Sequence, residues 1–177
     1  MIEISQHILD LIENSINAGA SEIHITIRVD EGQNFLWIVI EDNGSGFPDD
    51  PKEILTPFFT TKKEKKTGLG LSLAKQAVEQ TGGMLKIGTS NKLGGAMVEL
   101  YFVYSHIDTA PMGDLGSAIA GIIFTCPNIN FVVRVFKNDD LLLEINSVEL
   151  RKMYNNEFEI SKLVEKSINE KVSLLNI

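Results

Sequence analysis

The chain has 177 residues, of which 44% are hydrophobic and 23% are charged, and its formal net charge at pH 7 is −8. A length at the upper end of one typical domain predicts one core with an appendage, and the balanced composition excludes a disordered or low-complexity chain. The negative charge disfavours binding to nucleic acid or to anionic lipid, because the average surface repels both.

The sequence contains a single cysteine, Cys126, which excludes an internal disulfide and which we expect to be a small buried hydrophobic residue. The first residues alternate between polar and apolar, so no secretory signal peptide is predicted. No apolar run approaches the roughly 20 residues that a membrane-crossing helix needs. We therefore expect a cytoplasmic protein that does not associate with membranes.

The N-terminal segment predicts a helix followed by two strands. Apolar side chains recur every 3.6 residues over residues 3–18, which predicts an amphipathic helix with His7 on its polar side. Strict alternation predicts a half-buried strand over residues 23–29. The uninterrupted apolar run of residues 35–41 predicts a central strand buried on both faces.

Residues 42–68 carry most of the glycine, proline and lysine residues of the first half of the chain and predict a long loop. A loop of that length inside a compact domain is usually functional. Helical spacing returns over residues 69–81. Two further strands, over residues 84–89 and 96–104, complete the predicted sheet.

Residues 105–113 include Pro111, lack periodicity and form the predicted domain boundary. The pattern beyond them predicts a small α/β extension, residues 114–177, which packs on the first domain because about 70 residues are few for a separate core. Its expected elements are a helix over 114–125, strands over 129–137 and 141–145, and helices that begin near Ser147 and Ile160.

The sharpest motif is Asp42-Asn43-Gly44-Ser45-Gly46-Phe47-Pro48, which directly follows the second predicted strand. Glycines at alternate positions allow a sharp turn and the close approach of a flat ring. The Asp42 carboxylate is placed to accept a hydrogen bond from an exocyclic amino group such as adenine N6, and a bond to a charged acceptor contributes about 1.5–3 kcal/mol. The alternative is an ordinary Asp-Asn-Gly turn.

A second glycine motif, Lys66-Thr67-Gly68-Leu69-Gly70-Leu71, opens the helix predicted over residues 69–81. Unpaired backbone N–H groups at a helix N-terminus form an anion site, and glycine lets a phosphate come close. Four of the sixteen basic residues precede the helix, where a triphosphate would need positive charge: Lys62, Lys63, Lys65 and Lys66. The alternative is a loop-to-helix junction beside a solvated run of lysines.

A polar stripe runs along the first predicted helix and consists of Asp10, Glu13, Asn14 and Asn17. Asp10 and Asn14 lie one turn apart on the same side of the helix. Together they could hold a hydrated Mg²⁺ ion, which prefers one or two protein oxygen ligands plus phosphate and water. The alternative is the solvent-facing side that any surface helix has.

In combination, these motifs match one protein family in their order and spacing. The stretch from Leu9 to Ala20 resembles the N box of the GHKL ATPases, especially of their mismatch-repair MutL branch. The other matches are Asp42-x-Gly44-x-Gly46, similar to the first glycine box, Pro57-Phe58-Phe59-Thr60-Thr61-Lys62, similar to the phenylalanine box of histidine kinases, and Gly68-Leu69-Gly70-Leu71, similar to the second glycine box. The resemblance covers about residues 3–104.

The resemblance implies an α+β Bergerat fold, in which helices cover one face of a mixed sheet in a two-layer sandwich, over residues 1–104. It implies ATP and Mg²⁺ bound beneath a lid formed by about residues 47–67. The residues it assigns are Asn14 for Mg²⁺, Asp42 and Thr89 for adenine, and Gly44, Gly46, Phe47, Lys62, Gly68, Leu69, Gly70 and Leu71 around the nucleotide. The helical spacing of the polar stripe adds Asp10 as a second candidate ligand for Mg²⁺.

The resemblance leaves three functions open. The first is a regulatory kinase or kinase-like subunit that phosphorylates, or senses through, a partner protein; the kinase-like phenylalanine box favours it. The second is a conformational ATPase of the MutL and gyrase type, in which nucleotide closes a homodimer. The third is a nucleotide-sensing module without chemistry of its own.

Position 10 bears on this choice. In the hydrolysing branch of the family, the residue four before the magnesium asparagine is a glutamate that activates water, and in histidine kinases it is commonly asparagine. Asp10 is one methylene shorter than glutamate but can still serve as a base. The chain begins almost at the N box, so we expect any phosphoacceptor histidine to belong to another protein.

Overall fold

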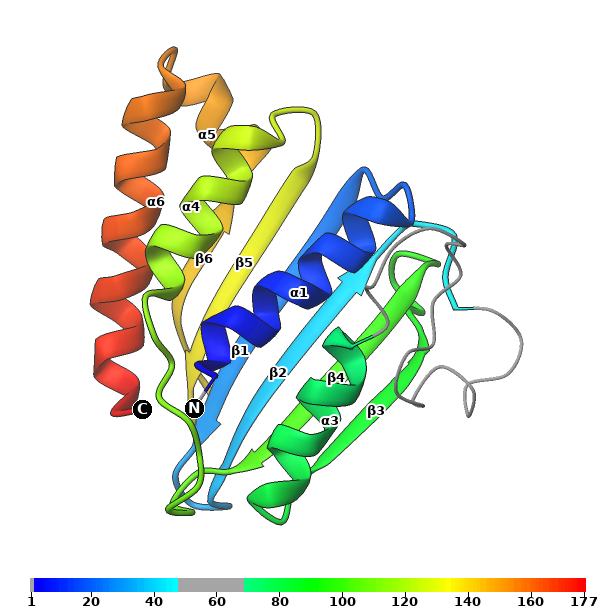
Figure 1. Ribbon diagram of the computed structural model, residues 1–177. Coiled ribbons are helices and arrows are strands. Elements are labelled where there is room, and N and C mark those ends of the chain that lie inside the picture. The colour runs from blue at the N-terminus through cyan, green and yellow to red at the C-terminus, as the bar shows by residue number, and fades with distance from the viewer. Residues whose placement is uncertain (1, 48–68) are drawn as a thin grey trace.

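The computed structural model of the chain describes residues 2–47 and 69–177. A six-stranded sheet runs in the order β3-β4-β2-β1-β5-β6, and helices cover one of its faces (Figure 1). All neighbouring strands are antiparallel except β1 and β5, which are parallel. The mixed sheet with helices on one face confirms the predicted α+β class.

The element boundaries follow the predicted ones closely. The strands are β1 (Glu22–Asp30), β2 (Phe35–Asp42), β3 (Met84–Thr89), β4 (Ala96–Val103), β5 (Asn130–Lys137) and β6 (Asp140–Asn146). The described helices are α1 (Ile4–Asn17), α3 (Gly70–Gln80), α4 (Leu115–Thr125), α5 (Ser147–Met153) and α6 (Glu157–Val172), with a final 3₁₀ turn at Ser173–Leu175.

Helix α1 lies on the sheet through its apolar stripe. Ile4, Ile8 and Ile12 are at most 1% exposed, because their 3.6-residue spacing places them on one side of the helix. His7 corrects the prediction, since only 2% of it is exposed and it does not lie on the solvent side. The helix ends before Gly19, whose φ of 79° is a left-handed conformation that glycine adopts without a steric penalty.

Strand β2 is central, but a second layer covers only one of its faces. Leu36 and Ile38 face the helices and are fully buried. On the opposite face Val39 is buried, whereas Phe35 and Trp37 are half-buried, so the prediction of burial on both faces is wrong for these two. A continuous apolar run therefore indicated a central strand without indicating two covering layers.

The C-terminal residues extend the same sheet. Strand β5 pairs in parallel with β1, and β6 forms the outer edge. Helices α4 and α6 pack against each other, and the Gly116 amide donates to Asn169 Oδ1 at 2.9 Å. Cys126 is half-buried against the core and not fully buried as expected. The division at residues 105–113 stays a prediction.

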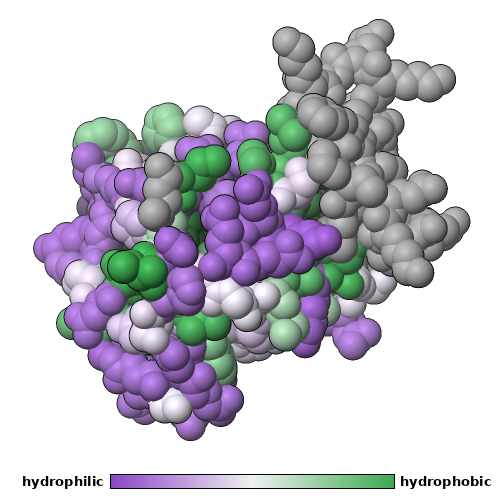
Figure 2. Space-filling model, turned by 60° about the horizontal axis from the view of Figure 1, so that its bottom comes forward, coloured by the Kyte–Doolittle hydropathy of each residue, from purple (hydrophilic) through white to green (hydrophobic). Residues whose placement is uncertain are grey.

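The face at the bottom of Figure 1 is mainly hydrophilic. Figure 2 brings the bottom of Figure 1 forward and shows hydrophilic side chains with separate apolar patches between them. Among the helices of the described ranges, none is both long enough and apolar enough to cross a bilayer.

The burial of His7 predicts that the free energy of unfolding of the protein depends on pH. It lines a cavity of about 210 Å³ together with Gln76, Gln80 and Asp108. Burial lowers the pKa of His7 below its usual 6.5, and the nearby Asp10 charge only partly opposes this. Between 6.5 and the lower pKa of the folded chain, the unfolded chain therefore binds a proton that the folded chain does not, and the free energy of unfolding falls as the pH falls through this range.

In the variant His7→Gln the free energy of unfolding should fall less on acidification, because glutamine does not titrate. Urea unfolding between about pH 7.5 and pH 5 measures it for both proteins. Equal losses of stability on acidification in the wild type and the variant would contradict the assignment.

Candidate functional site

The carboxylate of Asp42 joins three segments at the end of β2. Asp42 is 2% exposed. Its Oδ2 accepts a hydrogen bond from Ser15 Oγ of α1 at 2.5 Å. Its Oδ1 accepts from the Gly44 amide at 2.9 Å and from the Ala96 amide of β4 at 3.0 Å. Helix α1, the loop after β2 and the start of β4 are thus held by one buried side chain.

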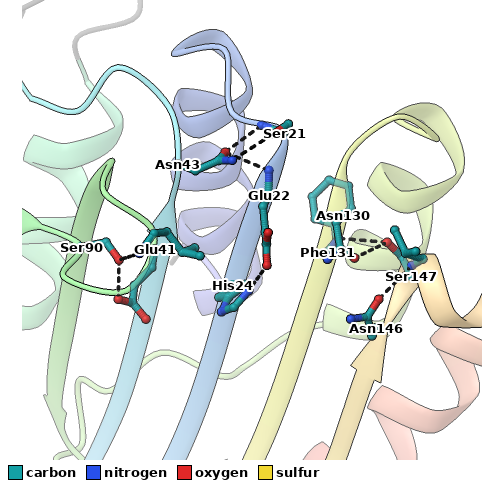
Figure 3. Close-up of polar contacts among 12 residues, drawn as sticks. Ser21, Glu22, His24, Glu41, Asn43, Ser90, Asn130, Phe131, Asn146 and Ser147 are labelled. Carbon is teal, nitrogen blue, oxygen red and sulfur yellow. Dashed lines mark hydrogen bonds and ion pairs between the residues drawn. The ribbon is translucent and has the colours of Figure 1, made fainter.

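Asn43 fixes the same loop to the turn between α1 and β1. Its Oδ1 accepts from the backbone amides of Ser21 and Glu22, both at 2.9 Å, and its Nδ2 donates to Ser21 Oγ at 2.9 Å (Figure 3). The Ser45 amide donates to the Ala18 carbonyl at 3.0 Å. The loop after β2 therefore has a defined path over residues 43–45.

Two glycines allow this close packing. A Cβ on Gly95 would collide with the carbonyl and carboxylate oxygens of Asp42 and with the Gly44 amide. A Cβ on Gly44 would lie 2.9 Å from the Ala18 carbonyl oxygen. Only glycine leaves room for the backbone to approach Asp42 so closely. The predicted residues Gly46, with φ of 74°, and half-buried Phe47 follow in the loop.

Thr89 lies in the same row of the sheet as Asp42. It pairs with Ala96, whose amide bonds to Asp42, and alternation along the strands places all three on the helix-covered face. Thr89 is exposed there. The adjoining turn is held by Ser90, whose Oγ donates to Glu41 Oε1 at 2.8 Å (Figure 3).

The polar stripe of α1 meets the first residues of α3. A Cβ on Gly70 would lie 3.3 Å from the Asp10 Cβ and 3.8 Å from Asn14 Nδ2. The structure thus brings Gly70 beside both predicted magnesium ligands, with Leu69 exposed and Leu71 half-buried. The first amides of a helix lack intrahelical acceptors, so they can bind an anion at this point.

These residues fit Mg²⁺ held jointly with a phosphate. Within residues 2–47 and 69–177 there is no group of three or more His, Cys, Asp or Glu side chains that could hold a metal by itself. A Mg²⁺ ion bound to phosphates needs only one or two protein oxygens. Asp10 and Asn14 can supply these oxygens beside the start of α3.

Several predicted site residues lie outside the described residues: Lys62, Gly68, the phenylalanine box, the lysine run and the proposed lid after Phe47.

Sequence reasoning missed three parts of the site: Ser15, Asn43 and Gly95. Ser15 lies on the buried side of α1, and the signal that could have found it is that a lone hydroxyl in a buried stripe needs a polar partner. Asn43 lies inside the recognised motif, but its contacts join residues 21 apart or more. Gly95 follows Gly94 in a turn, and its sequence position carried no indication that it packs on Asp42.

Comparisons with known proteins give matches over the N-terminal part of the chain. A family profile described as histidine kinase-, DNA gyrase B- and HSP90-like ATPase matches residues 2–105. The sensor histidine kinase ZraS of Escherichia coli K12 is 35% identical over 92 residues, which cover 51% of this chain and 20% of that protein. An NtrY-like sensor histidine kinase of Rickettsia bellii is 29% identical over 102 residues, 56% of this chain and 17% of that protein. The chain thus spans about a fifth of the length of these relatives.

Two solved structures support the fold. The Aquifex aeolicus MutL ATPase domain complexed with ADP aligns with a TM-score of 0.52 and 14% identity, over 90% of this chain and 70% of that one. The N-terminal domain of a DNA repair protein aligns with a TM-score of 0.55 and 17% identity, over 82% of this chain and 53% of that one. At these identities the likeness concerns the fold alone.

The variant Ser15→Ala should lower the free energy of unfolding by about 1.5–3 kcal/mol, the usual contribution of a hydrogen bond to a charged group. Urea unfolding measures the loss. Ser5→Ala is the matched control, because it removes another buried hydroxyl from the first turn of the same helix. A loss for Ser15→Ala no larger than that for Ser5→Ala would contradict the role of Asp42 as the joining group.

Proposed function

The chain belongs to the family of histidine kinase-, DNA gyrase B- and HSP90-like ATPases, and we propose that it binds Mg-ATP between α1, the end of β2 and the start of α3. The observation that carries the proposal is the buried Asp42 carboxylate, which three donors fix at the mouth of this region.

Asp42 is the adenine-binding residue of the proposal. A carboxylate offers about four lone-pair sites, and the described donors occupy three of them. The remaining site accepts the N6 amino group of adenine. The three donors also fix the orientation of the carboxylate, so little conformational freedom is lost on binding. Thr89, in the same row, lies beside the ring.

The phosphates lie at the start of α3 in this proposal. Leu69, Gly70 and Leu71 provide backbone amides there, and the positive end of the helix dipole favours negative charge. Lys62 and Gly68 belong to the same predicted phosphate site. Mg²⁺ supplies charge neutralisation when bound, and Asn14 and Asp10 hold it against the phosphate oxygens.

The chemistry that we favour is that of a regulatory kinase or kinase-like subunit acting through a partner protein. The sensor histidine kinases among the relatives support it. A conformational ATPase is the second candidate, because the stretch from Leu9 to Ala20 resembles the N box of the MutL branch. A nucleotide sensor without chemistry remains the third.

Asp10 separates these candidates. In an ATPase it would take a proton from the attacking water, and the shorter side chain demands a water placed closer to the helix than a glutamate would. In a kinase-like subunit or a sensor, Asp10 would only hold Mg²⁺ or water. An ATPase would release phosphate from ATP without a partner protein, whereas a kinase-like subunit or a sensor would not.

Phosphate release from Mg-ATP by the wild type, Asp10→Ala and Asn14→Ala, at several protein concentrations, tests the proposal. We expect nucleotide binding with little release by the chain alone, and loss of Mg²⁺-dependent binding in Asn14→Ala. Steady release that disappears in Asp10→Ala would contradict the kinase-like role and establish an ATPase. Release that rises more than linearly with protein concentration would further indicate dimer closure.

A further inference from the structure

The sheet has a second face, which no described element covers. The helices of the described residues all lie on the other side (Figure 1). Alternate residues of every strand point to this open face, among them His24 of β1 and Glu41 of β2 (Figure 3). The open face is thus separate from the proposed nucleotide site, which lies on the helix-covered side.

A belt of apolar and aromatic side chains, with Arg28 among them, crosses the open face from one edge of the sheet to the other. The strand register aligns one residue from each strand, in the order Met84, Tyr101, Trp37, Arg28, Phe136 and Leu141. Met84 and Leu141, at the two edges, are each 51% exposed. Trp37 stacks on Tyr101 with ring centroids 5.9 Å apart, and Arg28 lies 5.1 Å from the Phe136 ring centroid. A continuous belt of this kind is typical of an interaction surface.

A row of charges runs beside the belt. The register aligns Lys86, Glu99, Val39, Thr26, Arg134 and Glu144 across the six strands. Along the row two charged residues, positive then negative, flank each side of the neutral pair Val39 and Thr26. Within one chain Arg134 already pairs with Glu144 at 2.6 Å, and Glu99 accepts a hydrogen bond from the Tyr101 hydroxyl at 3.1 Å. Reversed end to end, the order of charges along the row places every positive charge opposite a negative one.

That reversal is what a two-fold axis produces. Consider two copies with their open faces together and a two-fold axis between the two sheets, parallel to the strands and midway between β1 and β2. Rotation about this axis reverses the strand order, so β3 of one copy lies over β6 of the other. Lys86 then faces Glu144, and Glu99 faces Arg134. An axis across the strands would instead place each strand over its own copy and bring like charges together.

The belt is complementary under the same operation. Trp37 of one copy faces Arg28 of the other, and tryptophan is the best ring for a cation–π contact. Tyr101 faces Phe136, and Met84 faces Leu141. A twisted sheet has the shape of a saddle. Rotation about an axis parallel to its strands gives a second sheet with the same curvature. The two sheets can therefore stack at the usual distance of about 10 Å.

We propose that the open face binds a second copy of this chain, sheet against sheet, about a two-fold axis parallel to the strands. A second copy is the occupant that both rows fit, because the charged row and the belt are each complementary to themselves under this rotation. The dimer does not depend on the proposed ATP site.

A charge swap between the edge strands tests the proposal. Lys86 and Glu144 lie five strand spacings apart, about 24 Å, so they do not contact each other within one chain. Sedimentation velocity over about 1–100 µM should show a concentration-dependent dimer for the full wild-type chain. Lys86→Glu or Glu144→Lys alone places like charges opposite each other twice per dimer and should raise the Kd about tenfold or more.

The double variant carrying both Lys86→Glu and Glu144→Lys should restore the dimer, because the opposite charges face each other again. The control Lys166→Glu makes the same change of net charge as Lys86→Glu, but at a 74% exposed position on α6, and should leave the Kd unchanged. Circular dichroism checks that each variant is folded. A monomer at every concentration, a dimer insensitive to the single reversals, or no restoration in the double variant would overturn the proposal.

Discussion

The buried carboxylate of Asp42 is the constraint on which the proposed nucleotide site depends. A negative charge that is 2% exposed is stable only if donors satisfy it, and the donors come from α1, from the loop after β2 and from β4. Satisfying the charge therefore fixes three segments that are far apart in sequence. The same bonds orient the one remaining acceptor site of the carboxylate, so the requirement of folding and the proposed recognition of adenine coincide in one side chain.

The rest of the site is arranged around this point. Helix α1 carries Ser15 on its buried side and Asp10 and Asn14 on the side that meets Gly70, so one helix supports the carboxylate and presents the proposed magnesium ligands. Gly95 and Gly44 let the backbone close around Asp42. The opposite face of the same sheet carries none of these residues, and its belt and charged row suit the proposed dimer.

Most of the fold could be predicted from the sequence, because local periodicity determines it. The 3.6-residue spacing in α1 and the alternation in β1 each identified their element within one or two residues. What could not be predicted depends on contacts across the chain. The role of Ser15 depends on Asp42, 27 residues away, and the burial of His7 depends on packing against residues near 76 and 108. The half-buried Trp37 shows that an apolar run does not report how many layers cover a strand.

The most direct test of the account is calorimetric titration of the chain with Mg-ATP and Mg-GTP, for the wild type and Asp42→Asn. The Asp42 carboxylate accepts the adenine amino group but repels the carbonyl oxygen of guanine, and a hydrogen bond to a charged acceptor corresponds to about ten- to a hundredfold in affinity. We predict that the wild type binds ATP at least tenfold more tightly than GTP and that Asp42→Asn loses this preference together with at least tenfold of its ATP affinity. Equal affinities for the two nucleotides, or unchanged ATP affinity in a folded Asp42→Asn variant, would contradict the account.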